Sequence, residues 1–457
     1  MAGSNKTREK LKNLECPFTW GMNKIDEVVK NHEETKTHDD EESVPILKWM
    51  RLLVHAYESV VKNYLTEANK CIVSAEEFWD YVKAEHADHI SLNVLDNIFK
   101  GTKCYVELEA GHLEEVKQIL ESTLDVNYKA SAKDRSTLNG CKCLAWSKYK
   151  DAGNLGIGRA IHFAELAIKD NPNFAVWHFM FAKNWRRQRR IAQCVSKPSV
   201  NEEKAFEKAY ELSSKPIYGI FFAQCHKEKR NLSKALSIYK KIFNTKPESC
   251  AVRLRLALGF IRQRELKMAK ECLDYVEERF PNDCMFLHYK GIYLETLCNY
   301  KEAAEYFLKA HKEKNYGAAM SYLKCKAKLR DGFDFVQYLE EMFKTYATFE
   351  DRDLDILLQI AACSYFCDND LPGAAKYYLQ AFEKYPNNRL YQCHECVLGG
   401  KSNVYDFLRN DFLKKAFACR DLDSGTKAIC EKLKDCCDKK YNSNRKSAES
   451  SFSKMKL

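Results

Sequence analysis

Small and apolar residues recur along the chain with a period of 34 residues. Pro247 and Pro281 are 34 residues apart, and units of that length begin at Pro216, Cys250 and Cys284. Each unit has a small residue at its eighth and twentieth positions and a tyrosine, leucine or phenylalanine at its twenty-fourth. These positions hold Ala223, Ala235 and Tyr239, then Ala257, Ala269 and Leu273, then Gly291, Ala303 and Phe307. The pattern predicts pairs of amphipathic helices.

This period and composition are those of the tetratricopeptide repeat, a helix–turn–helix unit. Small residues let the two helices approach closely, and the proline ends the second helix. Two more units fit when they start at Cys141 and Asp355, and less regular helical pairs are expected at residues 47–78, 95–124, 174–212 and 317–350. We therefore predict an all-α, tetratricopeptide-repeat superhelical solenoid of about 8–9 units.

The pattern divides the chain into five segments. Residues 1–13 are expected to be a flexible N-terminus and residues 14–140 to form N-terminal helical repeats. Residues 141–316 are the central repeats, which would form a basic groove, and residues 317–438 continue as helical repeats. Residues 439–457 are rich in Ser, Lys and Asn and are predicted to be a disordered tail.

Composition narrows the class of protein. The 457 residues include 20 cysteines and carry a formal charge of +10, with no secretory signal and no long apolar run. We expect a cytoplasmic protein without membrane contact, whose reduced cysteines act as small apolar residues. Cys393 and Cys396 form a single Cys-x-x-Cys pair, which leaves zinc as a weak alternative. No catalytic motif stands out, so neither enzymatic activity nor a cofactor is expected.

The positive charge is concentrated on predicted helices. Residues 183–190 hold five cations around a tryptophan, and Phe221, Arg255 and Tyr289 occupy the same position of successive repeats. Cations interleaved with aromatic residues favour a polyanion with unpaired bases, and hence single-stranded RNA. The candidate RNA-binding residues are Lys148, Trp185, Arg186, Arg187, Phe221, Arg255, Arg262 and Tyr289. Two alternatives stay open: these positions are solvated or core residues, or the groove binds a protein segment.

A short N-terminal motif adds a resemblance. The sequence Leu14-Glu-Cys-Pro-Phe-Thr-Trp20 resembles the Leu-x-Cys-x-Phe-Thr-Trp signature of the interferon-induced proteins with tetratricopeptide repeats, and Asp170-Asn-Pro-Asn-Phe174 and Phe286-Leu-His288 also match that family. The resemblance implies a non-catalytic antiviral effector of innate immunity. Such a protein would hold single-stranded 5′ ends of RNA, triphosphorylated or capped, in a positively charged channel.

The resemblance also assigns roles to residues. It places the family's RNA-contacting basic positions on Lys148, Arg255 and Arg262, and another family arginine on Asn184. Leu256 stands where the family has a tyrosine that stacks near the 5′ end, and Val252 replaces a second tyrosine. The competing hypothesis is a protein-interaction scaffold that binds partner segments or other repeat proteins, or associates with itself.

Overall fold

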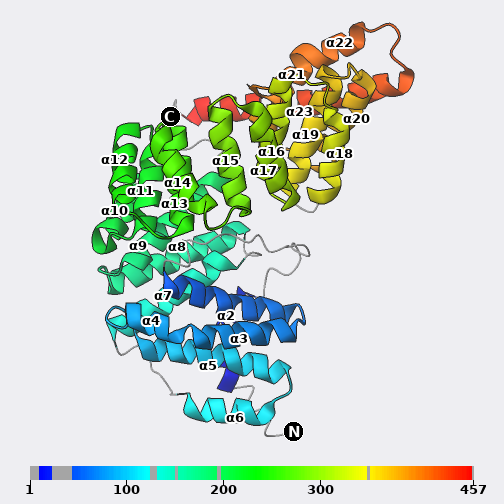
Figure 1. The fold of residues 1–457 in the computed structure, drawn as a ribbon. Helices are drawn as coiled ribbons and strands as arrows, with labels where there is room; N and C mark the ends of the chain where they lie inside the picture. The colour runs from blue at the N-terminus through cyan, green and yellow to red at the C-terminus, as the bar shows by residue number, and fades with distance from the viewer. Residues whose placement is uncertain are drawn as a thin grey trace. The chain divides into compact units, whose positions relative to one another are not determined.

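The computed structural model describes residues 10–22, 44–123, 131–149, 153–192, 197–346 and 350–454. It divides into two compact units, Met1–Met268 and Ala269–Leu457, and almost all of its regular structure is helical. Figure 1 shows successive helices packed as antiparallel pairs within each unit. The predicted all-α tetratricopeptide-repeat fold is confirmed, while the five-segment division stays a prediction.

The first unit is built from helices that pair with their neighbours in the chain. They are α2 (Pro45–Val61), α3 (Leu65–Glu77), α4 (Trp79–His86), α5 (Leu92–Glu109), α6 (Leu113–Ser122), α7 (Ala132–Lys148), α8 (Gly153–Asp170), α9 (Ala175–Ala192), α10 (Val200–Ser213), α11 (Pro216–Glu228), α12 (Leu232–Asn244) and α13 (Cys250–Arg262). The pairs predicted at residues 47–78, 95–124 and 174–212 correspond to α2 and α3, α5 and α6, and α9 and α10. Helix α4 was not predicted. Helix α14 (Leu266–Glu277) contains the boundary between the units.

The second unit continues the helical pairs and ends in less regular structure. Its elements are α15 (Cys284–Thr296), α16 (Tyr300–Lys312), α17 (Tyr316–Leu329), α18 (Phe335–Tyr346), α19 (Glu350–Phe366), α20 (Leu371–Lys384), η3 (Arg389–Gln392), β1 (His394–Glu395), β2 (Lys401–Ser402), α21 (Val404–Phe407), η4 (Leu408–Phe412), α22 (Leu413–Ala418) and α23 (Ser424–Lys454). Strands β1 and β2 pair antiparallel, with His394 opposite Ser402.

Two C-terminal expectations differ from the structure. The antiparallel hairpin interrupts a region expected to be helical, because Gly399 and Gly400 adopt positive φ angles of 116° and 89° and turn the chain. Helix α23 extends through residues 439–454 of the expected disordered tail. That segment has no glycine or proline to end a helix already formed, and each further residue adds a hydrogen bond.

The repeat period is visible in the backbone. Pro216, Cys250 and Cys284 are the first residues of α11, α13 and α15, as the period predicts. The turns that follow these helices each contain a left-handed residue, again 34 positions apart. These residues are Arg230, Arg264 and Cys298, with φ angles of 64°, 59° and 60°. The same turn geometry therefore recurs in three successive repeats.

Close packing explains the small residues. A Cβ atom added to Gly291 would lie 2.5 Å from the ring of Phe307, the large residue at the twenty-fourth position of the same repeat. Ala223 and Ala257, at the equivalent eighth position, are fully buried. A larger side chain there would force the paired helices apart.

The unit starts predicted at Cys141 and Asp355 are wrong. Helix α7 begins at Ala132 because Ser131 caps it, accepting a hydrogen bond from the backbone N–H of Asp134. Helix α19 begins at Glu350. Both helices are therefore longer at their N-termini than the 34-residue template allows. Among the residues that the structure describes, no helix is both long and apolar enough to cross a bilayer.

Candidate nucleic-acid interface

A pocket of about 450 Å³ opens between α7, α9 and α11 in the first unit. Its lining brings together four of the eight predicted residues, namely Lys148, Arg186, Arg187 and Phe221, with five further side chains. These are Ser147, Met180, Lys183, Asn184 and Arg190. Five of the nine lining residues are cations, and none of the described residues that line it is acidic. We call this site the α9 pocket.

Helical spacing on α9 gathers these cations. Lys183, Arg187 and Arg190 are separated by four and three residues, so they share one face of the helix. Lys183 and Arg190 are not among the candidate residues drawn from the sequence. Their helical spacing from Arg187 could have identified them from the sequence as residues on the same face.

A hydrogen-bonded contact fixes the end of α7 against α9. The buried Asn184 side chain donates from Nδ2 to Oγ of Ser147 at 2.6 Å, and Arg187 donates from Nη1 to the Ser147 carbonyl oxygen at 2.8 Å. Lys148, the last residue of α7, is thereby placed beside Arg187 at the pocket wall. Asn184 stands where the resemblance places a family arginine, and Arg187 adds a guanidinium one helical turn away.

Phe221 forms an apolar base for several cations. Only 4% of it is exposed, and its ring packs edge-on against Phe179 with centroids 5.2 Å apart. The guanidinium carbons of Arg186 and Arg255 lie 5.5 and 5.4 Å from the ring centroid, and Lys183 Nζ lies at 5.7 Å. Cations at this distance are attracted to the ring face. Because its ring is already covered, Phe221 offers no open face for base stacking, and the ring contacts neighbouring cations instead.

Arg186 and its neighbour Arg189 also belong to an ion network. Arg186 Nη2 lies 2.5 Å from Glu228 Oε1, and Arg189 Nε lies 2.9 Å from Glu202 Oε2. Arg189 also contacts Glu228, so that one carboxylate bridges two arginines. The arginines hold the pKa of Glu228 below its usual value despite burial. Arg186 is therefore oriented by Glu228 while it lines the pocket.

The lowered pKa of Lys227, on α11, reflects the positive electrostatic potential around the pocket. Its pKa is lowered to about 8, first by burial and then by repulsion from nearby cations that include Arg262, Arg186 and Arg190. The predicted Arg262 thus acts on the same electrostatic region as the α9 pocket, although it does not line the pocket. Nothing in the sequence marks Lys227, because the effect comes from residues of α9 and α13.

Four predicted residues do not line the α9 pocket: Arg255 and Arg262, described above, and Trp185 and Tyr289. Trp185 lies on another face of α9, where its ring contacts Phe181 one helical turn earlier, with centroids 6.2 Å apart. Tyr289 belongs to the second unit and neighbours His288 on α15. Of the predicted ladder of Phe221, Arg255 and Tyr289, the first two meet as a cation–π pair, and the part of Tyr289 in it stays a prediction.

The alternative zinc pair lies in the C-terminal hairpin. The thiol of Cys393 points to the carbonyl oxygen of Arg389 at 3.9 Å, and the backbone N–H of Cys396 bonds to the carbonyl of Gly400. Neither cysteine belongs to a described group of three or more potential ligand residues whose ligand atoms lie within 4.8 Å of one another. The hairpin therefore gives zinc binding at Cys393 and Cys396 no third ligand among the described residues.

Sequence comparison gives two distant relatives, and no protein-family model matches the chain. It is 21% identical over 309 residues to interferon-induced protein with tetratricopeptide repeats 2 of Mus musculus, a match that covers 65% of this chain. It is also 21% identical over 346 residues to the Cricetulus griseus protein of that name, covering 74% of this chain and 71% of that protein. The chain spans only 60% of the length of the mouse relative.

Structural comparison extends over nearly the whole chain. The human IFIT1 dimer with PPP-AAAA superposes with a TM-score of 0.60 at 14% identity, covering 96% of this chain and 99% of that one. The human IFIT1 dimer with m7Gppp-AAAA gives a TM-score of 0.62 at 14% identity, covering 97% and 99%. At such low identity the superposition by itself establishes the fold. In both sequence and structure, the chain is therefore similar to the interferon-induced proteins with tetratricopeptide repeats, from which it has diverged widely.

Proposed function

We propose that this protein is a non-catalytic RNA-binding protein that holds single-stranded RNA in the α9 pocket. The observation that carries the proposal is the convergence of five cations from α7 and α9 on one pocket with no acidic lining residue. Guanidinium groups bind phosphate through paired N–H donors, and lysines add charge without directional demands. A chain of phosphates satisfies such a surface better than an apolar protein segment does.

The pocket favours backbone recognition over base recognition. Phe221 is covered by its neighbours, and Trp185 lies away from the pocket, so neither presents an open ring there. The described residues that line the pocket supply charge and hydrogen-bond donors. We therefore expect affinity to depend steeply on salt, as it does when phosphates release counterions on binding.

The 5′ end of RNA is the proposed specific target. The solved structures of IFIT1 include complexes with PPP-AAAA and m7Gppp-AAAA. The resemblance noted in the sequence places the family's RNA-contacting basic positions on Lys148, Arg255 and Arg262. Val252 and Leu256, which replace family tyrosines, are buried in the core. A triphosphate bound by cations therefore suits this chain better than a cap that requires stacking. We extend the proposal to a cytoplasmic antiviral role in innate immunity.

The test is binding of one short single-stranded RNA carrying a 5′-triphosphate, a cap or a 5′-hydroxyl, at two salt concentrations. We expect the triphosphate form to bind most tightly and every form to weaken as salt rises. Arg187→Glu should lower affinity by about tenfold or more, since a phosphate contact is replaced by repulsion. Lys208→Glu, which reverses a charge on α10 outside the pocket, is the matched control and should change little.

Three results would contradict parts of the proposal. Equal losses from Arg187→Glu and Lys208→Glu would show that binding follows net charge and not the pocket. Equal affinity for all three 5′ forms would show that the protein does not recognise the 5′ end. If no form bound even at low salt, the scaffold hypothesis would replace RNA binding, and partner capture and self-association would then be measured.

A further inference from the structure

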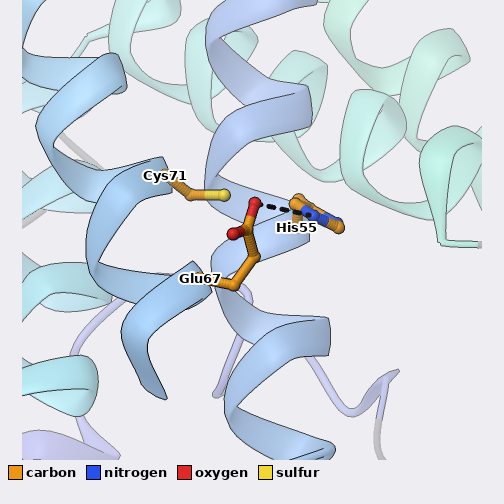
Figure 2. A group of neighbouring side chains, drawn as sticks. All are labelled: His55, Glu67 and Cys71. Carbon is orange, nitrogen blue, oxygen red and sulfur yellow. Dashed lines mark ion pairs between the residues drawn. The ribbon is translucent and has the colours of Figure 1, made fainter. Parts of the chain in front are cut away.

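We propose that His55, Glu67 and Cys71 bind a zinc ion between α2 and α3. The three side chains offer one nitrogen, one oxygen and one sulfur whose positions all lie within 4.8 Å of one another. Figure 2 shows them converging, with the ring of His55 on one helix facing the carboxylate and thiol on the other. This site lies outside the α9 pocket and is independent of RNA binding.

Local helical geometry brings the ligands together. Glu67 and Cys71 are four residues apart on α3 and therefore share one face of that helix. Helix α2 packs directly against α3 and supplies His55. His55 Nε2 lies 4.0 Å from Glu67 Oε1. In a tetrahedral zinc site, bond lengths of roughly 2.0–2.3 Å place ligand atoms about 3.3–3.8 Å apart, so a small rotation of the Glu67 side chain would close the site.

The donor set favours zinc over calcium or magnesium. Calcium and magnesium prefer sites made of oxygen ligands, whereas a thiolate, an imidazole and one carboxylate suit zinc. Cys71 is 4% exposed, while His55 and Glu67 are more open to solvent. An ion could therefore enter from the solvent side and be held against the helix pair. Binding would release a proton from the thiol, because the thiolate is the ligand.

A second carboxylate lies beside the histidine. Glu58, one turn after His55 on α2, places Oε2 3.8 Å from His55 Nδ1, so the other ring nitrogen faces Glu67. Zinc-binding histidines commonly donate from their second nitrogen to a carboxylate, and Glu58 is the carboxylate placed to take that role here. Lys70 Nζ lies 3.5 Å from the other Glu67 oxygen, Oε2. The oxygen nearest His55 is therefore distinct from the one that contacts the lysine.

Three protein ligands leave a fourth position for water. The metal would link the two helices of the first described helical pair, and so stabilise the N-terminal part of the first unit. The structure contains a matched comparison in Glu107, His112 and Glu115, which also bring ligand atoms within 4.8 Å of one another. That group has no thiol, and His112 is 58% exposed, so it is expected to hold zinc more weakly.

The experiment measures zinc and cobalt binding to the full-length protein after metal removal under reducing conditions. We expect one equivalent of zinc to bind and to raise the unfolding temperature. Cobalt should give a thiolate charge-transfer band together with the strong visible bands of a four-coordinate ion. His55→Ala and Glu67→Gln should each weaken zinc binding by about tenfold or more. His112→Ala is the control and should leave the affinity of this equivalent unchanged.

Cys71→Ala separates this site from the many other cysteines. We expect it to abolish the cobalt charge-transfer band, while Cys104→Ala, which removes another buried thiol of the same unit, should retain it. Retention of the band and of the zinc affinity in both Cys71→Ala and His55→Ala would overturn the proposal. Loss of the zinc equivalent in His112→Ala alone would also overturn it, by assigning the ion to the second group.

Discussion

The two sides of helix α9 carry the same residue type with different surroundings. On one side, Arg189 is held by Glu202 from α10 and by Glu228 from α11. On the other, Arg187 and Arg190 line a pocket whose described lining residues include no acid. The cations of one basic run on a helix therefore do not form a single binding surface. Carboxylates on the helices packed against it decide which cations stabilise the fold and which remain available to a polyanion.

Burial sharpens the difference. The Glu202 side chain is only 1% exposed and Arg189 only 12% exposed, and two near-parallel contacts of 2.9 Å join them. A charge in that position is costly to leave without its partner. Arg190, by contrast, is exposed at the pocket rim. The same substitution at neighbouring positions should therefore have opposite consequences for stability and RNA binding.

The largest expected effect comes from Arg189→Ala. Removal of the guanidinium leaves Glu202 buried without its ion-pair partner, which should lower the free energy of unfolding by about 3–5 kcal/mol. Urea denaturation followed by circular dichroism would measure the change. Any RNA binding by the folded fraction should persist, because Arg189 does not line the α9 pocket.

Arg190→Ala is the matched control. Its free energy of unfolding should stay within about 0.5 kcal/mol of the parent protein, as at most surface positions, while its RNA affinity should fall. If Arg189→Ala and Arg190→Ala destabilised the protein equally, the division of α9 into a structural side and a binding side would be wrong.

Much of the fold could be predicted from the sequence because the repeat fixes local geometry. The period of 34 residues correctly gave the first residues of α11, α13 and α15. It could not give the starts of α7 and α19, because each helix begins before its template unit and α7 begins at a local cap, Ser131. The C-terminal hairpin was missed because a strand of two residues leaves no periodic signal.

The candidate site was predictable only in part. Charge and spacing identified Lys148, Arg186 and Arg187, which the structure brings together. Charge and spacing could not show that Trp185 lies outside the pocket, on a different face of α9, where its ring contacts Phe181. They also could not show that Phe221 is covered, because that depends on packing between helices separated in sequence.

A smaller effect is expected from the apolar base of the pocket. Phe221→Leu keeps an apolar side chain but removes the ring faced by Arg186 and Arg255. We expect a loss of about 1–2 kcal/mol in the free energy of unfolding and an RNA affinity several-fold lower, because the cations lose their aromatic support. Isothermal titration calorimetry and urea denaturation would measure the two quantities.

Phe222→Leu provides the control at the next position. Phe222 is similarly buried, but its ring packs against His226, with centroids 4.6 Å apart, and does not line the pocket. Its loss should cost comparable stability and leave RNA affinity unchanged. A parallel loss of affinity in both variants would show that Phe221 acts on RNA only through general stability.

The smallest effect is a pH dependence of RNA binding. The pKa of Lys227 is about 8, so this lysine loses its charge as the pH rises from 7 to 9. The nearby thiols of Cys143 and Cys225 have pKa values raised to about 12 by burial, so they stay neutral over that interval. RNA affinity should therefore fall a few-fold between pH 7 and 9, the effect of losing about one cation near the phosphates.

The same ionisation should act on stability with the opposite sign. In the unfolded chain, Lys227 regains a pKa near its ordinary value of 10.5, so between pH 8 and 10.5 the unfolded state holds the proton that the folded state has lost. The contribution of Lys227 to the free energy of unfolding therefore rises with pH in that interval. Lys227→Met should flatten both dependences, and Lys227→Arg should keep RNA affinity high at pH 9. If affinity fell with pH to the same extent in Lys227→Met, the titrating group would lie elsewhere.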